Sequence, residues 1–375
     1  MAVGMDSSIL LVILACGITA AIIPKSCPNL RFNSIPKDHV YHSKVKPLII
    51  AHRGQPKLYQ ENTYDGILSA VDVKADGFEL DIYKTKDNKL VVFHDDNTEK
   101  LTGVSKIIWE STYEELQLLN LTTTYVAGGK TYTYDKPRKI PLLEEILKAT
   151  KDTGLLHYLE MKPSTFFAGD SNLVNKTGEL VADMITRLDL TLKSIVISFD
   201  YRKIAVVKSH NPNIVVGTLY SQKFSAYPKL LCAREYFPAL SNCIADAPTD
   251  PFGYFKFTLN SGLLFKASGS SSIDCDITLY NNVKYSNDTI AMMRKNYSPD
   301  ISTGFYTIYS LSKTEKQNKQ DEIKTKELIK QGGGHRLITD DVPRLRVLVG
   351  KDSTGRWIKA TTSVVFLCSL ICAMM

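Results

Sequence analysis

Two histidines, His52 and His94, and a pair of carboxylates, Glu79 and Asp81, are the residues of this 375-residue chain best suited to chemistry. They lie in or next to apolar runs that are typical of strands. Histidine exchanges protons near neutral pH, and paired carboxylates bind hard divalent cations. A metal-assisted phosphodiester hydrolase needs a base, an acid and positive charge on the phosphoryl oxygens, and these residue types can supply all three.

The spacing of the carboxylates suits a metal site. Glu79 and Asp81 are two residues apart in a strand-like run, so their side chains project to the same side. With Glu160 they supply three oxygen donors, a set that favours Ca²⁺ or Mg²⁺ over zinc. We therefore predict one divalent cation, Ca²⁺ or Mg²⁺, held by these three carboxylates. The alternative is a structural salt-bridge network with Lys84, Lys162 or Arg53.

The same stretches supply cations and proton-transfer groups for a phosphate ester. Arg53 and Lys162 can bring positive charge to the phosphoryl oxygens. His52 and His94 can exchange the roles of general base and general acid. Glu61 is a further acidic candidate, which would orient Arg53 or a metal-bound water. Taken singly, each histidine has a simpler interpretation, His52 as a buried structural residue and His94 as a turn residue.

A repeating strand and helix pattern is needed to bring these residues together. Strand-like apolar runs lie at residues 48–52, 77–83, 156–161, 194–199, 214–219, 275–280, 304–309 and 336–339. Helical patterns lie between most of them, at residues 63–73, 142–150, 175–188, 201–209, 287–294 and 313–330. The alternation predicts a (β/α)8 barrel, whose active site lies at the C-terminal ends of the strands. An open doubly wound sheet is the alternative.

A long stretch at residues 84–141 separates the second and third predicted strands. It contains a further strand at 90–94, a helical pattern at 112–120 and a Gly- and Tyr-rich segment at 127–134. Such a length is more than a loop, so we interpret it as a small insertion over the barrel mouth that carries His94. Asn62 or Thr63 is the expected N-cap of the first helix, and residues 268–272 are expected to form a flexible loop.

Both ends of the chain are apolar and suggest export. Residues 1–23 match a signal peptide or N-terminal anchor, and residues 24–46 form a lead segment before the predicted barrel at 47–349. Residues 350–375 begin with small and polar residues and continue as an apolar tail, an order that resembles a glycolipid (GPI) anchor signal. A short tail anchor is the alternative. We expect a protein of the secretory pathway, extracellular or at the cell surface.

Cysteines and glycosylation motifs agree with export. Without the two apolar ends four cysteines remain, which allow two disulfides in three connectivities: Cys27, Cys232, Cys243 and Cys275. N-x-S/T triplets occur at Asn120, Asn175, Asn287 and Asn296. The formal charge of +7 suits an anionic substrate or membrane surface. Because the lysines are scattered over the chain, we expect no nucleic-acid partner.

The order of motifs resembles the glycerophosphodiester phosphodiesterase family. The resemblance runs from IIAHRG through ENT, FELDIYKTKDNKLVVFHDD, KIPLLEEIL and LEMKP to VISFD, and on to FYTIYSLS and LITDDVP, over residues 47–346. It implies a (β/α)8 barrel with an insertion after the second strand, a divalent cation, and hydrolysis to glycerol 3-phosphate and an alcohol. It also implies catalysis by His52 and His94, metal ligation by the three carboxylates, and phosphate contacts by Arg53 and Lys162.

The main hypothesis is therefore an enzyme that acts on glycerophosphodiesters such as glycerophosphocholine or glycerophosphoinositol. One alternative is a lysophospholipase D-like or related phospholipase D toxin-like activity on lipid head groups, with an apolar groove beside Trp109, Tyr125 and residues 166–167. The other is a non-catalytic surface protein that keeps the barrel as a scaffold. Asn281 and Tyr306 are further candidates for substrate contacts, and the oligomeric state is not predicted.

Overall fold

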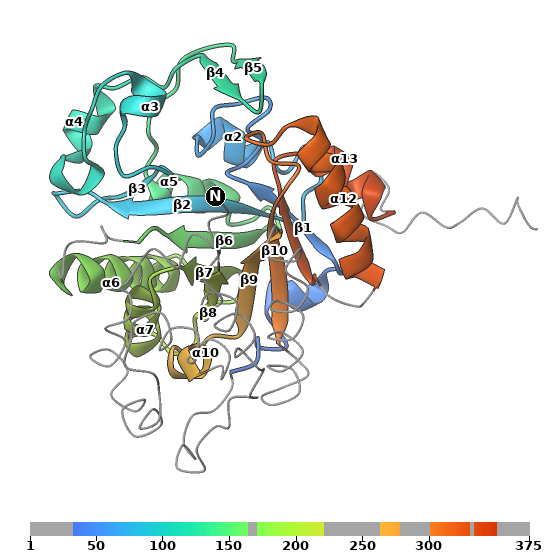
Figure 1. Ribbon diagram of the computed structural model, residues 1–375. Coiled ribbons are helices and arrows are strands. Elements are labelled where there is room, and N and C mark those ends of the chain that lie inside the picture. Colours follow the sequence, from blue (N-terminus) through green and yellow to red (C-terminus); the bar gives the residue numbers. More distant parts are fainter. Residues whose placement is uncertain (1–32, 164–170, 221–262, 278–300, 331–333, 351–375) are drawn as a thin grey trace, which may run out of the picture.

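Eight parallel strands close into a barrel in the computed structural model, which describes residues 33–163, 171–220, 263–277, 301–330 and 334–350 (Figure 1). Strand β1 (Leu48–His52) pairs in parallel with both β2 (Gly77–Lys84) and β11 (Arg336–Thr339), and this double pairing closes the circle. The predicted (β/α)8 barrel is confirmed, and the open sheet is wrong.

Each barrel strand pairs with the next barrel strand in the chain, as expected for repeated strand–helix units. The remaining barrel strands are β6 (Leu156–Met161), β7 (Ser194–Ser198), β8 (Val215–Tyr220), β9 (Ser272–Asp276) and β10 (Ser302–Ile308). The helices of the units are α2 (Tyr64–Leu68), α5 (Leu143–Thr150), α6 (Ser171–Arg187), α7 (Tyr201–His210), α10 (Leu263–Ala267), α12 (Glu315–Lys330) and α13 (Val342–Leu348).

The strand register brings the polar residues of three strands to one level of the barrel. His52 at the end of β1 lies opposite Glu79 in β2, and Asp81 lies opposite Glu160 in β6. These positions are near the C-terminal ends of the strands, where barrel active sites form.

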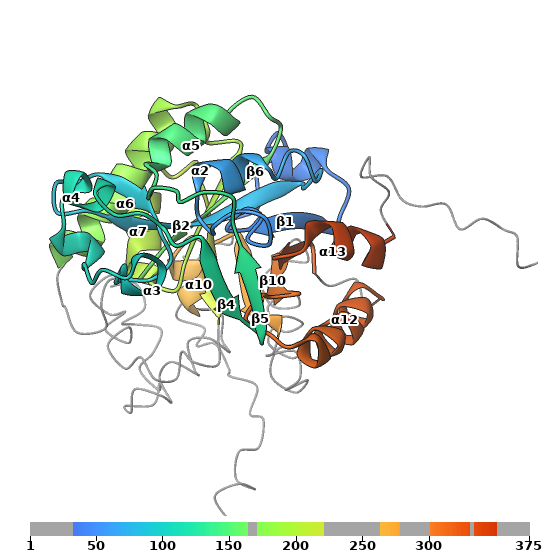
Figure 2. The ribbon, with the colours of Figure 1, turned by 90° about the horizontal axis from the view of Figure 1, so that it is seen from above.

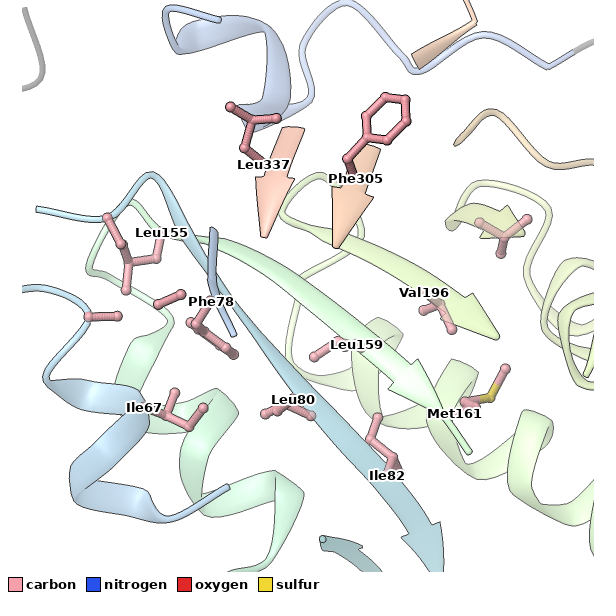
Figure 3. Packing of buried hydrophobic residues seen from close by; sticks show 14 of the residues in the cluster. Ile67, Phe78, Leu80, Ile82, Leu155, Leu159, Met161, Val196, Phe305 and Leu337 are labelled. Atoms are coloured by element: carbon pink, nitrogen blue, oxygen red, sulfur yellow. The ribbon is translucent and has the colours of Figure 1, made fainter. Parts of the chain in front are cut away.

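Alternation along β2 separates the core from the site. Phe78, Leu80 and Ile82 point outward and pack under the helices, and all three are fully buried (Figure 3). Each such side chain stabilises the fold by about 1.5–3 kcal/mol through burial. Glu79 and Asp81 lie between them in the sequence and therefore project into the barrel.

The insertion predicted after the second strand is present (Figure 1). Its buried residues form a hydrophobic cluster of their own. Strand β3 (Leu90–Val92) pairs with the C-terminal half of β2 in an antiparallel arrangement. Four short elements follow it and surround a cluster that includes Val91, Phe93 and Leu116. They are α3 (Glu99–Thr102), the 3₁₀ turn η2 (Ile108–Glu110), α4 (Tyr113–Gln117) and the hairpin of β4 (Thr124–Ala127) and β5 (Lys130–Thr133). The hairpin includes most of the Gly- and Tyr-rich segment at 127–134, for which no strands were predicted.

The hairpin reaches across to the loop between β10 and α12. Gly128 at its tip has φ +57°, and a Cβ there would lie 2.4 Å from the carbonyl oxygen of Leu311 and 2.5 Å from that of Lys313. Only glycine fits such a close approach with a positive φ. Seen from above, the β4–β5 hairpin lies in front of β10 in Figure 2, whereas Figure 1 shows it well above that strand, so the insertion reaches the loop after β10 and not the strand itself.

The opposite end of the barrel is filled by the lead segment and a buried ion pair. Ile35 and Tyr41, the latter in the 3₁₀ turn η1 (Val40–Ser43), pack into the barrel interior. Arg336 and Asp274 are both fully buried there and lie 3.3 Å apart. Ser302 donates a hydrogen bond to Tyr41 (2.7 Å) and so ties the lead segment to the barrel wall.

Several boundaries differ from the sequence predictions. Residues 268–272 are not a flexible loop, because Ser268, Ser270, Ser271 and Ser272 are buried and lead directly into β9. The first helix is short, since α2 ends at Leu68 and is followed by turns. The helix predicted at 287–294 lies outside the described residues, as do both apolar ends, Cys27, Cys232, Cys243, Asn287 and Asn296.

Cys275 is the one cysteine of the predicted mature chain that the structure describes, and it is a buried thiol in β9. Among the residues described, no helix is both long and apolar enough to cross a membrane.

Candidate active site

A cavity of about 1080 Å³ opens among the C-terminal ends of the strands and the insertion. Six of the predicted site residues line it: His52, Arg53, Glu61, His94, Glu160 and Lys162. Glu79 and Asp81 lie buried behind this lining, within reach of Glu160. The structure therefore brings all eight predicted site residues to one place.

The three carboxylates form a compact group that can hold a metal ion. Glu79, Asp81 and Glu160 each offer an oxygen, and these oxygens all lie within 4.8 Å of one another. All three residues are buried, with exposed fractions of 2%, 1% and 8%. Hard oxygen donors gathered in this way fit a divalent cation such as Ca²⁺ or Mg²⁺.

The burial and crowding of the three carboxyl groups shift their pKa values. Burial, with Asp81 and Glu160 nearby, raises the pKa of Glu79 well above its usual value. Burial also raises the pKa of Glu160, against the opposing effect of Lys162. Burial acts in the same direction on Asp81, but Lys162 and Arg53 outweigh it and hold the pKa of Asp81 well below its usual range. Three crowded carboxylates are thus short of positive charge, which a divalent cation would supply.

Two cations of the chain flank the carboxylates. Nζ of Lys162 lies 2.8 Å from an oxygen of Glu160 and 3.2 Å from one of Asp81. Nε of Arg53 lies 3.2 Å from Asp81, and the backbone N–H of Arg53 donates to Glu79 (3.1 Å). The salt-bridge network considered as an alternative is therefore present, and it coexists with a geometry that suits a metal.

A tight turn after β1 directs the side chain of Arg53 toward Asp81 and Glu61. Arg53 has φ +52° and Gly54 has φ +87°, and a Cβ on Gly54 would lie 2.4 Å from the carbonyl oxygen of Gly66 in α2. Nη1 of Arg53 donates to Glu61 at 2.9 Å, so Glu61 orients the guanidinium group. This contact agrees with one of the two roles considered for Glu61, that of orienting Arg53.

His52 has a carboxylate partner from the other end of the chain. Its Nδ1 lies 2.5 Å from Oδ1 of Asp340, and its Nε2 lies 3.9 Å from Oε2 of Glu79. Asp340 also accepts a hydrogen bond from the backbone N–H of Leu311 (2.7 Å), which fixes the carboxylate. Although burial raises the pKa of Asp340, His52 outweighs this effect and lowers it, so the carboxylate is ionised and holds the proton of His52 on Nδ1.

His94 has the same arrangement on the insertion side of the cavity. It follows β3, and Phe93 N–H donates to the carbonyl of Asp81 (3.0 Å), which ties this segment to β2. Nδ1 of His94 lies 2.5 Å from Asp95. Burial, together with Arg53 and Lys162, lowers the pKa of His94 to about 4, so the ring is neutral near pH 7.

Two residues of the site were missed or misassigned from the sequence. Asp340 was not proposed, although it lies in the LITDDVP motif directly after the last strand. Asn62 was considered as an N-cap, but its amide donates to Asp81 (2.7 Å) and accepts from the Asp81 N–H (3.1 Å). The N-cap of α2 is Thr63, whose hydroxyl accepts from Gly66 N–H. The acidic residue at a strand end was the signal for Asp340.

The far wall of the cavity comes from later strands. Tyr306, one of the candidates for a substrate contact, lines it together with Phe199 and Asp276. The hydroxyl of Tyr306 donates to the Tyr220 carbonyl (2.6 Å), so its ring forms the wall. Trp109, suggested for an apolar groove, packs against the insertion core instead. Asn281 and residues 166–167 lie outside the described residues.

A closed parallel barrel with three carboxylates that could hold a metal ion, two histidines paired with carboxylates and two flanking cations fits the class of phosphoryl-transfer hydrolases. The sequence profile of the glycerophosphoryl diester phosphodiesterase family matches residues 52–243, and the chain belongs to this family. It is therefore an enzyme, a phosphodiesterase, and the interpretation as a non-catalytic scaffold is not retained.

Known relatives agree with this assignment. The chain is 32% identical over 178 residues to a glycerophosphodiester phosphodiesterase from Caldanaerobacter subterraneus subsp. tengcongensis, which covers 47% of this chain and 68% of that protein. Its fold is similar to a phosphodiesterase from Oleispira antarctica solved with the product sn-glycerol-3-phosphate (TM-score 0.55, 17% identity, 83% of this chain and 98% of that one). It is also similar to a glycerophosphodiester phosphodiesterase from Parabacteroides distasonis (TM-score 0.52, 20% identity, 80% and 96%).

Proposed function

We propose that this phosphodiesterase hydrolyses glycerophosphodiesters to glycerol 3-phosphate and an alcohol, with His52 and His94 as its acid and base. One observation carries the proposal: the two histidines line the same cavity, and Nδ1 of each ring contacts a carboxylate. Nδ1 of His52 contacts Asp340, and Nδ1 of His94 contacts Asp95. A carboxylate at Nδ1 leaves Nε2 of each ring to exchange protons with a substrate.

The chemistry requires one proton to leave the attacking water and another to reach the departing alkoxide. One histidine takes the first proton as the P–O bond to water forms, and the other gives a proton as the P–O bond to the alcohol breaks. Arg53 and Lys162 offset the negative charge that builds up on the phosphoryl oxygens. Their position beside the carboxylates supports this role, since Lys162 lies 3.2 Å and Arg53 3.2 Å from Asp81.

Glu79, Asp81 and Glu160 would hold one divalent cation, Ca²⁺ or Mg²⁺. When bound, the ion would supply further positive charge to the phosphoryl group. The crowding of three buried carboxylates within 4.8 Å supports this proposal. Removing the metal with EDTA should abolish activity, and adding Ca²⁺ and Mg²⁺ separately should identify the ion that restores it.

An assay of the purified protein with Ca²⁺ or Mg²⁺ tests the proposal on glycerophosphocholine and glycerophosphoinositol. His52→Ala and His94→Ala should each lower kcat by about 10²-fold or more. His210→Ala is the matched control, because His210 is exposed on α7 and also contacts an aspartate, Asp183 (2.6 Å). The proposal fails if the wild type cleaves neither diester with either ion, and a histidine variant with normal kcat would refute that residue's role.

A lysophospholipase D-like activity is the second candidate, and the size of the cavity favours testing it. About 1080 Å³ exceeds the needs of a glycerophosphodiester, and Tyr125 and Phe199 add aromatic surface to the lining. Lysophosphatidylcholine in the same assay separates the two activities: release of choline from it at a rate equal to or above that from glycerophosphocholine would assign the lipid as substrate.

We further propose that the protein enters the secretory pathway and is held at the cell surface by a glycolipid anchor added near residue 353. The apolar ends at 1–23 and 350–375 support this proposal. Phosphatidylinositol-specific phospholipase C should release the protein from membranes. Retention in the membrane fraction after this treatment would favour a tail anchor, and recovery in the medium without treatment would favour secretion.

A further inference from the structure

The C-terminal end of β6 is held by donors from the next strand–helix unit. Ser198, the last residue of β7, donates its hydroxyl to the carbonyl oxygen of Met161 (2.6 Å). Lys203, in the first turn of α7, donates from Nζ to the carbonyl oxygen of Lys162 (2.6 Å). Two successive carbonyls at the strand end are thus fixed by side chains 37 and 41 residues away in the sequence, at the point where the active site begins.

Lys203 is an unusual residue for this position, because its side chain is only 2% exposed. Taking an ammonium group out of water costs free energy, and an apolar side chain of similar volume would avoid that cost. Burial lowers the pKa of Lys203 to about 8, with Asp200 opposing the shift, so the group is charged at pH 7. Its hydrogen bond to Lys162 is therefore charge-assisted, a stronger and shorter class of bond.

The bond matters because of what Lys162 does. Its backbone N–H donates to the carbonyl of Ile82 in β2 (3.1 Å), and its carbonyl accepts from Lys203, so the backbone of this residue is held on both sides. From this fixed backbone, Nζ of Lys162 reaches Asp81 at 3.2 Å and Glu160 at 2.8 Å. A lysine side chain is long and flexible, so the place of its ammonium group depends on where the backbone directs it.

We propose that Lys203 is a positioning residue for the phosphodiesterase reaction, which acts by fixing the backbone from which the Lys162 ammonium group reaches the phosphoryl group. The inference rests on the proposed phosphate role of Lys162. Lys203 does not itself line the cavity, and it reaches the site through its hydrogen bond to the carbonyl of Lys162, which does, so we expect any effect on catalysis to pass through Lys162.

The test is a Lys203→Met variant, which keeps the length of the apolar stem and removes the donor. Its kcat/KM on glycerophosphocholine should fall at least about tenfold, because small misplacements of a charged group lower reaction rates strongly. Lys208→Met is the matched control: Lys208 lies on the same helix and also donates to backbone carbonyls, those of Pro212 (2.5 Å) and Ile214 (3.1 Å), away from the site. It should keep wild-type kcat/KM.

Stability measurements separate positioning from a purely structural role. Lys203→Met removes a buried ammonium group but leaves the Lys162 carbonyl without this donor, so the two effects oppose each other and the midpoint of urea unfolding should stay close to that of the wild type while the activity falls. A lower midpoint together with wild-type kcat/KM would overturn the proposal. Ser198→Ala, which removes the neighbouring donor with little change in volume, should lower kcat/KM in the same direction; a wild-type value for both variants would also overturn it.

A double-mutant cycle shows whether Lys203 works through Lys162. On a Lys162→Met background, Lys203→Met should cause no further loss of kcat/KM, whereas independent effects would multiply. Multiplicative losses would refute the inference. Failure of the proposed function is distinguishable, since the wild type would then be inactive on every diester; failure of the phosphate role would appear as normal activity of Lys162→Met.

Discussion

His157 should make the fold sensitive to mild acid, and the size of the effect follows from its surroundings. It lies in β6 with no exposed surface, packs on the ring of Phe78 with centroids 4.9 Å apart, and its Nε2 lies 3.4 Å from the Thr150 carbonyl. Burial lowers its pKa from 6.5 to about 3, against the opposing effect of Thr150. Above pH 6.5 the ring is neutral in both the folded and the unfolded chain, and it contributes no pH dependence.

Below pH 6.5 the unfolded chain binds a proton on His157, whereas the folded chain keeps the ring neutral. The free energy of unfolding therefore falls as the pH falls toward 3. Between pH 7 and pH 5 this one residue should lower the free energy of unfolding by about 2 kcal/mol. His157→Phe and His157→Gln replace the ring with side chains that do not titrate. Each variant should lose about 2 kcal/mol less than the wild type between pH 7 and pH 5.

Urea unfolding at the two pH values, followed by circular dichroism, measures these free energies. Comparing the change with pH within each protein removes the cost of the substitution itself, which differs between phenylalanine and glutamine. Equal losses for the wild type and both variants over this interval would refute the reasoning, because they would mean that the folded chain accepts the proton on His157.

Three further predictions follow from other contacts. Asp340→Asn should lower kcat about 10²-fold with the fold intact, because His52 loses the carboxylate at its Nδ1; wild-type kcat would contradict this. Asp274→Asn should lower the free energy of unfolding in urea by about 3 kcal/mol, because it leaves the fully buried Arg336 without its carboxylate; a loss below about 1 kcal/mol would contradict this. Gly128→Ala should destabilise the protein by about 1 kcal/mol more than Gly129→Ala, since both have positive φ but only the first meets a backbone carbonyl, and equal thermal midpoints would count against the contact.

Much of the fold could be predicted because its signals are local. Apolar runs separated by helical patterns depend on neighbouring residues, and every barrel strand was found near its predicted place. The burial of residues 268–272 could not be predicted, since a run of serines with a glycine has the composition of a loop, and only the folded barrel buries these residues and brings Arg336 and Tyr158 to the hydroxyl of Ser272.

The candidate site divides in the same way. Glu79 and Asp81 were predictable together because alternation along a strand puts them on one side, whatever the rest of the chain does. The partner of His52 was not predictable by this reasoning, because Asp340 is 288 residues away and only the pairing of β1 with β11 brings them to 2.5 Å. Asn62 was considered, beside Thr63, only as a cap, because its hydrogen bonds to Asp81 also depend on a contact between elements.

By itself, the sequence determined the chemical types of the active-site residues and the order of the strands that carry them. The tertiary structure decided which groups face each other: closure of the barrel joins the first strand to the last, and the turn of α7 places the ammonium group of Lys203 on the backbone of Lys162. The physical reason is the different range of the interactions involved. Periodicity and residue type act over a few neighbours, whereas hydrogen bonds and charge pairing act over a few ångströms between segments that only folding brings together.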